Sequence, residues 1–250
     1  MAGEDAGRFG GRVALVTGAS SGLGQAVARS LSEGGARVFG VGRDEARLKA
    51  ALDGPENAWL AADLTSPAAC TEAARACAER FGGIDILVNA AGAHTMRHTA
   101  EVSDQEWERD LAVNLSAPFF LSRAALPHLL ERGGCIVNVA SIAGLEGQAY
   151  SAGYCAAKHG LIGLTRAMAL EFDGRGIRVN AVCPGGMTTP LLENFTFPED
   201  PDYALIMKTA TARGLMDPAQ VANVIAFLCS DEASAVHGAV YTVDNGKMAL

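Results

Sequence analysis

The sequence lacks a block of basic residues and a long apolar run. Of its 250 residues, 28 are acidic and 20 are Lys or Arg, which gives a formal net charge of −8. This balance argues against nucleic acids and anionic membranes as partners. No stretch approaches the ~20 apolar residues that a membrane span requires, so we expect no membrane association. The N-terminal tail, residues 1–11, lacks the basic start and apolar centre of a signal peptide. We therefore expect a cytoplasmic protein.

Metal-binding and disulfide spacings are also missing. The six cysteines form no CxxC pair and show no ligand spacing with the five histidines. In a cytoplasmic protein such cysteines are typically reduced core residues. We therefore expect no metal site, and only Cys155, beside Tyr154, is a candidate reactive thiol.

What the sequence does contain is material for a sizeable core, with 49% hydrophobic and 19% charged residues. An α/β domain of this length commonly stays single, so residues 1–250 are predicted to form one domain. Seven apolar segments alternate with amphipathic ones over short connections, which predicts a Rossmann-type, doubly wound parallel sheet with helices on both faces. The predicted strands are 12–16, 36–41, 58–62, 84–92, 135–140, 177–184 and 239–243. Two long helices are predicted over 104–132 and 149–172.

A glycine-rich turn, TGASSGLG over residues 17–24, joins the first predicted strand to the first predicted helix. Gly18, Gly22 and Gly24 allow a tight turn and a close approach of the backbone to a pyrophosphate. The N-terminus of the following helix favours the charge of that group. A glycine-rich loop alone is weak evidence, but its place between this strand and this helix predicts a dinucleotide site.

The end of the second predicted strand bears on the choice of cofactor. An acidic residue there would bind the ribose diol, whereas Arg accommodates a 2′-phosphate. The sequence reads Gly42 and Arg43, so NADP(H) is favoured over NAD(H). Alternatively, Arg43 is merely solvated and Asp44 caps the next helix. Asp63, after the third strand, would accept from the adenine amino group or help to cap a helix.

Tyr154 and Lys158 lie four residues apart in a predicted helix, so their side chains share one face. A phenol with its ordinary pKa near 10 is a poor proton carrier at neutral pH, but a neighbouring ammonium favours the phenolate. We therefore expect Lys158 to lower the pKa of Tyr154, which could then exchange a proton near pH 7. Ser141 would sit at the carboxyl end of a strand, where its hydroxyl could hold a substrate oxygen beside the phenol.

Taken in order and with their intervals, these motifs resemble the short-chain dehydrogenase/reductase family over essentially the whole chain. The matches are TGASSGLG (17–24), Asp63, NAAG (89–92), Asn114, Ser141, Tyr154 with Lys158, and PGGMTTP (184–190). Three positions depart from the family pattern: Ala90 where Asn is usual, Met187 where Val is common, and Asn245 where Gly is usual. The first two leave the reaction class intact, whereas Asn245 leaves the local turn geometry open.

The resemblance implies a role for each matched residue. Tyr154 would be the general acid/base, Ser141 would orient the substrate oxygen, Lys158 would also bind the nicotinamide ribose, and Asn114 would hold a water in a proton relay. Thr189 would contact the carboxamide. The expected cofactor site comprises Gly18, Ser20, Ser21, Gly22, Leu23, Gly24, Arg43, Asp63, Leu64, Asn89, Ala90, Ala91, Gly92, Tyr154, Lys158, Pro184, Gly185, Met187 and Thr189. A homotetramer, or failing that a dimer, built on the two long helices is also implied.

The expected activity is the interconversion of a secondary alcohol and a ketone by hydride transfer. Two alternatives are an NADP(H)-sensing binding module without chemistry and a non-redox lyase on the same fold. The loop 186–216 is expected to cover the substrate. Candidate substrate contacts are His94, Met96, Leu145, Glu146, Tyr150, Met187, Leu191, Leu192, Phe195, Phe197 and Tyr203. Because most of these are apolar, we expect a hydrophobic carbonyl or alcohol, and the sequence leaves 3-oxoacyl thioesters, cyclic ketones and steroid-like rings open.

Overall fold

The computed structural model describes residues 7–193, 197–211 and 213–249. Its centre is a seven-stranded parallel sheet with the strand order β3-β2-β1-β4-β5-β6-β7. The strands are β1 (Val13–Thr17), β2 (Arg37–Gly42), β3 (Ala58–Ala61), β4 (Ile86–Asn89), β5 (Gly134–Val139), β6 (Ile177–Pro184) and β7 (Val240–Val243). The predicted doubly wound sheet is confirmed.

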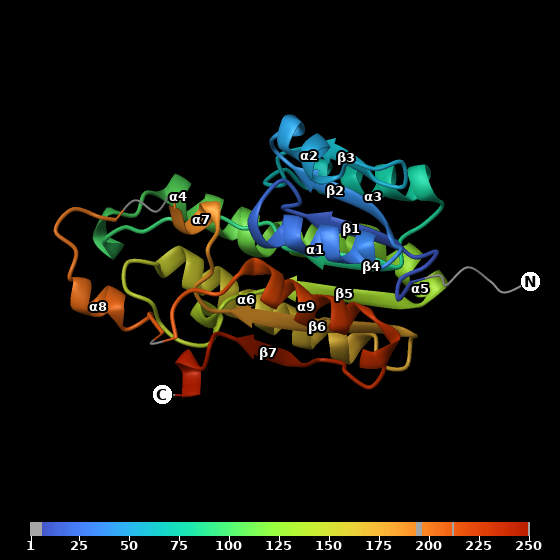
Figure 1. The fold of residues 1–250 in the computed structure, drawn as a ribbon. Coiled ribbons are helices and arrows are strands. Elements are labelled where there is room, and N and C mark those ends of the chain that lie inside the picture. The colour runs from blue at the N-terminus through green and yellow to red at the C-terminus, as the bar shows by residue number, and fades with distance from the viewer. Residues whose placement is uncertain (1–6, 194–196, 212, 250) are drawn as a thin grey trace, which may run out of the picture.

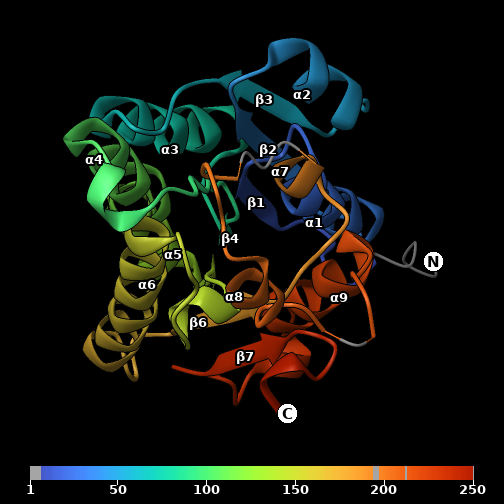
Figure 2. The same ribbon diagram turned by 90° about the vertical axis from the view of Figure 1, so that its left-hand side faces the viewer.

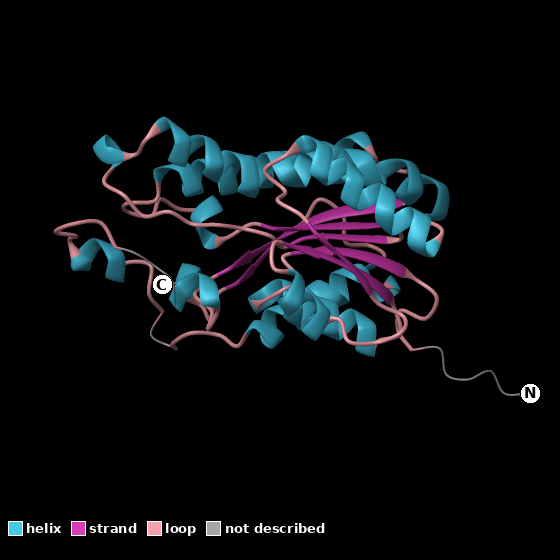
Figure 3. Cartoon of the chain, turned by 90° about the horizontal axis from the view of Figure 1, so that it is seen from above, coloured by secondary structure: helices cyan, strands magenta, loops and turns pink. Residues whose placement is uncertain are grey.

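Helices cover both faces of the sheet, as Figures 1 and 3 show. One face packs against α1 (Gly22–Glu33) and α9 (Pro218–Cys229). The other packs against α3 (Pro67–Phe81), α5 (Ala117–Arg132) and α6 (Ala152–Glu171). The remaining helices are α2 (Glu45–Ala51), α4 (Asp104–Leu111), α7 (Pro190–Glu193) and α8 (Tyr203–Met207), with short turns η1 (Thr99–Glu101), η2 (Ala112–Ser116), η3 (Ile142–Gly144), η4 (Asp231–Ala233) and η5 (Lys247–Ala249). Within the described residues, no helix is long and apolar enough to cross a membrane.

The first strand shows why these segments are continuously apolar. Every residue of β1 is buried, and its side chains alternate between the two helical layers: Val13 and Leu15 join one core cluster, whereas Ala14 and Val16 join the other. The predicted strand 84–92 is longer than β4, because the chain leaves the sheet after Asn89. There the N–H groups of Ala90 and Ala91 both donate to the hydroxyl of Thr17, each at 3.0 Å.

The long helix predicted over 104–132 is present, but one of its turns is π-helical. The structure divides it into α4, a π-helical turn at η2 and α5. Pro118, at the start of α5, has no N–H to donate to the carbonyl of Asn114, so regular hydrogen bonding cannot continue through this point. The side chain of Asn114 lies in this turn and donates to the carbonyl of Asp110 at 3.0 Å. Such π turns are frequent at functional sites.

Two other boundaries differ for local reasons. The predicted helix 149–172 begins only at Ala152, because Tyr150 has a φ of 64°, which is incompatible with a right-handed helix. The loop expected to cover the substrate, 186–216, contains α7 and α8. A bridge between Met187 and Met216 joins its two ends.

Asn245, where Gly was expected, has a φ of 56°, a conformation that Asn tolerates, and its amide donates to the carbonyl of Gly214 at 3.1 Å.

Candidate active site

A cleft of about 420 Å³ opens at the carboxyl ends of the strands. Figure 2 views the molecule from the end where α7 and α8 lie over these loops. Ligands of doubly wound sheets bind at this edge. Of the residues predicted to bind or to act, those lining the cleft are Gly18, Ser20, Ser21, Gly22, Leu23, Gly24, Arg43, Asp63, Leu64, Ala90, Ala91, Gly92, His94, Met96, Ser141, Tyr154, Lys158, Pro184, Gly185, Met187, Thr189, Leu192 and Phe197. Residues far apart in the sequence therefore meet in one place.

The glycine-rich turn forms one side of the cleft and fits a dinucleotide. Gly18 and Gly22 have φ values of 70° and 54°, a backbone conformation that favours glycine. A Cβ on Gly18 would lie 3.0 Å from the Cα of Ala91, so the loops after β1 and β4 can approach only without a side chain there. Ser21 precedes α1 without making a side-chain cap, and the first N–H groups of that helix are suited to an anion such as a pyrophosphate.

Arg43 and Asp63 line the cleft beyond this loop, after β2 and β3. The Asp63 carboxylate accepts from the backbone N–H of Thr65 at 3.0 Å. This bond is the main reason that the pKa of Asp63 lies below its ordinary value, and the positive charges of Arg109 and Arg43 lower it further. Asp44 caps α2 by accepting from the N–H of Arg47 at 3.0 Å, as one of the sequence-based alternatives proposed.

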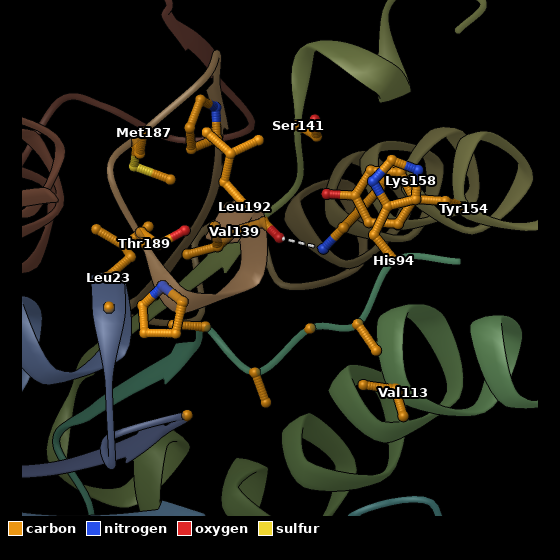
Figure 4. Close-up of a pocket in the computed structure, with 18 of the residues that line it drawn as sticks. Leu23, His94, Val113, Val139, Ser141, Tyr154, Lys158, Met187, Thr189 and Leu192 are labelled. Atoms are coloured by element: carbon orange, nitrogen blue, oxygen red, sulfur yellow. Dashed lines mark hydrogen bonds between the residues drawn. The ribbon is translucent and has the colours of Figure 1, made fainter. Parts of the chain in front are cut away.

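Ser141, Tyr154 and Lys158 come together on the opposite side of the cleft (Figure 4). Ser141 lies two residues after the end of β5, and its hydroxyl accepts from the N–H of Ala143 at 3.1 Å. Tyr154 and Lys158 lie in the first two turns of α6, with the Lys158 Nζ 5.5 Å from the centroid of the phenol ring. The Lys158 ammonium donates to the carbonyl of Val139 at 2.8 Å.

The electrostatics of this group differ from the expectation that Lys158 lowers the pKa of Tyr154. Both side chains are buried. Burial disfavours the charged form of each group: it raises the pKa of Tyr154 to about 12 and lowers the pKa of Lys158 to about 8. The Ser141 hydroxyl acts to lower the pKa of Tyr154, but this effect is smaller than that of burial. The phenol therefore keeps its proton at neutral pH.

Asn114 and Asn89 lie behind the cleft and do not line it. The Asn114 amide donates to the carbonyl of Ala93 at 2.8 Å, and its Oδ1 accepts from the N–H of the same residue at 3.3 Å. The Asn89 amide donates to the side chain of Asn138 at 2.8 Å. Asn114 therefore fixes the backbone that lines the cleft. A Cβ on Gly92 would fall 3.1 Å from Asn114 Oδ1 and 3.8 Å from Lys158 Nζ, so the small residue keeps this space open.

Several candidate substrate contacts lie elsewhere. Leu145 is exposed outside the cleft, and Glu146 forms an ion pair with Lys247. The hydroxyl of Tyr150 accepts from the N–H of Asp202 at 2.9 Å, so this ring also lies outside the cleft. Tyr203 is largely exposed. Phe195 and the side chain of Leu191 lie outside the described residues.

Sequence reasoning missed two polar residues that line the cleft beside Tyr154, Gln148 and Ser151. Their position between Ser141 and Tyr154 was the available signal. It also missed that the ring of His94 stacks on the ring of Tyr154. The candidate thiol Cys155 is half-buried, and burial raises its pKa, which disfavours the reactive thiolate.

Comparisons with known proteins find relatives over nearly the whole chain. Residues 18–247 match the family model described as enoyl-(acyl carrier protein) reductase. The chain is 40% identical over 245 residues to meso-2,3-butanediol dehydrogenase of Serratia marcescens, covering 97% of this chain and 96% of that protein. It is 38% identical over 239 residues to the 3-oxoacyl-(acyl-carrier-protein) reductase FabG of Vibrio cholerae, covering 94% and 97%. The crystal structure of 3-ketoacyl-(acyl-carrier-protein) reductase from Brucella melitensis complexed with NADH superposes with a TM-score of 0.87 at 33% identity, covering 96% of this chain and 99% of that one.

Fold, site and relatives together define a nicotinamide-dependent oxidoreductase acting on CH–OH groups. The chain belongs to the short-chain dehydrogenase/reductase family, as the sequence motifs predicted. The comparisons support neither the cofactor-sensing module nor the lyase.

Proposed function

We propose that this protein interconverts a secondary alcohol and a ketone, with Tyr154 transferring the proton at the substrate oxygen. The observation that carries this proposal is the meeting of a phenol, a hydroxyl and an ammonium, from Tyr154, Ser141 and Lys158, at the rim of a cleft whose other side is the glycine-rich turn. Bound nicotinamide would supply or accept the hydride. The turn at residues 17–24 and the open space beside Gly92 would hold that cofactor.

Each side chain has a distinct task in ketone reduction. Ser141 donates a hydrogen bond to the substrate oxygen and stabilises the negative charge that develops there. Tyr154, whose pKa of about 12 keeps it protonated at neutral pH, gives its proton to that oxygen. Lys158, which lies beside Tyr154 and Gly92, would bind the nicotinamide ribose. Asn114 holds the backbone of Ala93, and with it one wall of the cleft, in position.

We further propose that NADP(H) is the preferred cofactor. The tip of β2 holds Gly42 and Arg43 instead of an acidic residue, and Arg43 lines the cleft. Arg109 also lines the cleft, and both guanidinium groups influence the Asp63 carboxylate. Two cations at this end of the site support binding of a 2′-phosphate.

The assembly is proposed to be a cytoplasmic homotetramer. Three large apolar side chains on α4, α5 and α6 are exposed in the single chain: Trp107 and Phe119, each 41% exposed, and Leu170, 80% exposed. Exposed apolar groups on adjacent helices are typical of subunit interfaces. Light scattering after size exclusion would test the proposal, and the mass of a dimer or of a monomer would contradict a tetramer.

The activity is tested by titrating the protein with NADPH and NADH, followed by a carbonyl panel with the tighter cofactor. Tyr154→Phe keeps the ring and removes the proton. We expect cofactor dissociation constants within about twofold of wild type and a turnover at least ~100-fold lower, the usual contribution of general acid catalysis. A variant that retains wild-type turnover would exclude Tyr154 as the proton donor.

A further inference from the structure

Residues 197–207, which we call the covering segment, include α8 and lie over the loops at the carboxyl ends of the strands (Figure 2). Phe197 and Ile206 from this segment line the cleft. Most residues of the segment are exposed, and Pro198 is its only buried residue. A segment that buries so little of its surface is held in place by few contacts and opens at a low cost in free energy.

Two hydrogen bonds attach the covering segment to side chains outside it. The N–H of Asp202 donates to the phenolic oxygen of Tyr150 at 2.9 Å. The Nε2 of His98 lies 2.8 Å from the carbonyl oxygen of Glu199, and because a carbonyl can only accept, the imidazole is the donor. The rings of Tyr150 and His98 also meet edge to face, with the centroids 5.0 Å apart and the planes inclined by 81°. We call Tyr150 and His98 the latch.

The backbone of Tyr150 directs its side chain to this contact. Its φ of 64° is uncommon for a residue with a side chain. The carbonyl of Tyr150 accepts from the N–H of Arg97 at 2.9 Å, and Arg97 is in turn paired with Glu106 on α4 at 3.1 Å. The neighbouring loop thus holds the unusual conformation, which places the phenol against Asp202 and outside the cleft. Backbone strain that is maintained in this way is concentrated at ligand clamps and switch regions.

Asp202 connects the latch to the wall of the cleft. Its side chain caps α8 by accepting from the N–H of Ala204 at 2.8 Å. Its carbonyl accepts from the N–H groups of Leu205 and Ile206 at 3.1 and 3.3 Å. Because Ile206 lines the cleft, the latch holds the start of α8 and, with it, an apolar part of the cleft wall.

The far end of the 186–216 loop is attached separately. Met187 and Met216 form a bridge, and the N–H of Met216 donates to the carbonyl of Gly186 at 3.0 Å. The amide of Asn245 holds the carbonyl of Gly214. None of these contacts involves the covering segment, so they would persist if the latch released it.

We propose that Tyr150 and His98 are positioning residues that hold the covering segment closed over the bound substrate, and that the segment moves away from the cleft when these two contacts break. The inference rests on the proposed function, because it takes the covered site to be the substrate site. A ligand in the cleft contacts Phe197 and Ile206 only while the segment is closed, so it binds the closed state more tightly than the open one. Weakening the latch should therefore weaken substrate binding and leave the reacting groups unchanged.

Residue-resolved amide hydrogen exchange tests the latch without a substrate. Tyr150→Phe keeps the ring and removes the acceptor, whereas His98→Phe keeps an aromatic ring and removes the donor. The amides of Leu205 and Ile206 bond to Asp202 and not to the latch. We expect them to exchange about 5-fold faster in each variant, the equivalent of one lost hydrogen bond. Tyr203→Phe, the same change at a tyrosine that is 62% exposed, should leave these rates within twofold of wild type.

Steady-state kinetics tests the role of the latch in the reaction, with the preferred cofactor and the carbonyl of the panel that is reduced fastest. Both latch variants should raise KM about 5-fold and leave kcat and the cofactor dissociation constant within twofold of wild type. Tyr203→Phe should change none of the three. A merely structural role would instead lower kcat or weaken cofactor binding as well.

Exchange at Leu205 and Ile206 that stays at the wild-type rate in both latch variants would refute the latch, even if the Asp202 amide alone exchanges faster. Faster exchange with an unchanged KM would overturn the role in holding the substrate and leave the proposed function standing. If the wild-type protein reduces no carbonyl with either nicotinamide, the proposed function fails, and the exchange rates still decide whether the latch exists. Thermal unfolding identifies a variant that does not fold, in which case the other latch variant decides.

Discussion

Asp110 is a buried carboxyl group whose ionisation should weaken the fold. It lies on α4 and is 4% exposed, packed so closely against α6 that a Cβ on Gly153 would fall 2.8 Å from its Oδ2. Its Oδ1 accepts no hydrogen bond from the described residues, and a hydrogen bond from Thr95 offers only partial compensation. Burial, aided by the charge of Glu106 and opposed by that of Arg109, raises the pKa of Asp110 from 3.8 to about 6.

The sign of the effect follows from these two values. An acid with a raised pKa binds its proton more tightly in the folded state, so stability falls as pH rises from about 4 to about 6 and then stays low. Taking about 1.36 kcal/mol for each pH unit, the two pKa values imply a cost of about 1.6 kcal/mol at pH 5 and about 3 kcal/mol at pH 8. Asp110→Asn keeps the shape and cannot ionise, so its advantage over wild type should grow by about 1.4 kcal/mol between these two pH values.

Thermal unfolding at fixed protein concentration measures this difference. For a chain of this length, about 1.4 kcal/mol corresponds to roughly 3–6 °C, so the Tm gain of the variant at pH 8 should exceed its gain at pH 5 by that amount. Asp53→Asn, the same change at an exposed position, should show no such pH dependence. Equal gains for Asp110→Asn at pH 5 and pH 8 would refute the reasoning, because only a titrating group makes them differ.

Two further predictions concern the cofactor and the proton donor. Arg43→Glu should weaken NADPH binding by at least ~10-fold and change NADH binding far less, as fluorescence titration would show; equal losses for both would speak against a 2′-phosphate contact. Because the pKa of Tyr154 is raised to about 12, the phenolate needed for alcohol oxidation is scarce at neutral pH, so kcat/KM for oxidation should rise from pH 7 to pH 9 while that for ketone reduction does not. An oxidation rate that is flat over this range would contradict this assignment of the proton acceptor.

The parts of the site that are local in sequence could be predicted. The glycine-rich turn needs only a strand before it and a helix after it, and the pair Tyr154 and Lys158 needs only one helix face. The meeting of these residues in one cleft could also be predicted, because parallel strands bring their carboxyl ends to the same edge of the sheet.

The parts that depend on packing could not be predicted. Whether a phenol beside an ammonium has a raised or a lowered pKa depends on how deeply both are buried, and the sequence does not state that depth. Tyr150 shows the same limit, since its left-handed backbone turns a plausible substrate contact toward Asp202. From the sequence alone, Asp110 is an ordinary acidic residue on the surface of a helix. Only the packing of α6 against α4 shows that it is buried.

Thr17 links the two halves of the cleft through a single oxygen atom. Its hydroxyl is the common acceptor for the two N–H groups that follow β4, while its own backbone leads into the glycine-rich turn. The glycine-rich turn and the segment that leads to Gly92, both proposed to hold the cofactor, are thus joined through one hydroxyl. A displacement of one of these two segments would therefore displace the other. We expect the distance between them, and so the spacing of the cofactor groups that they contact, to be set by the protein alone.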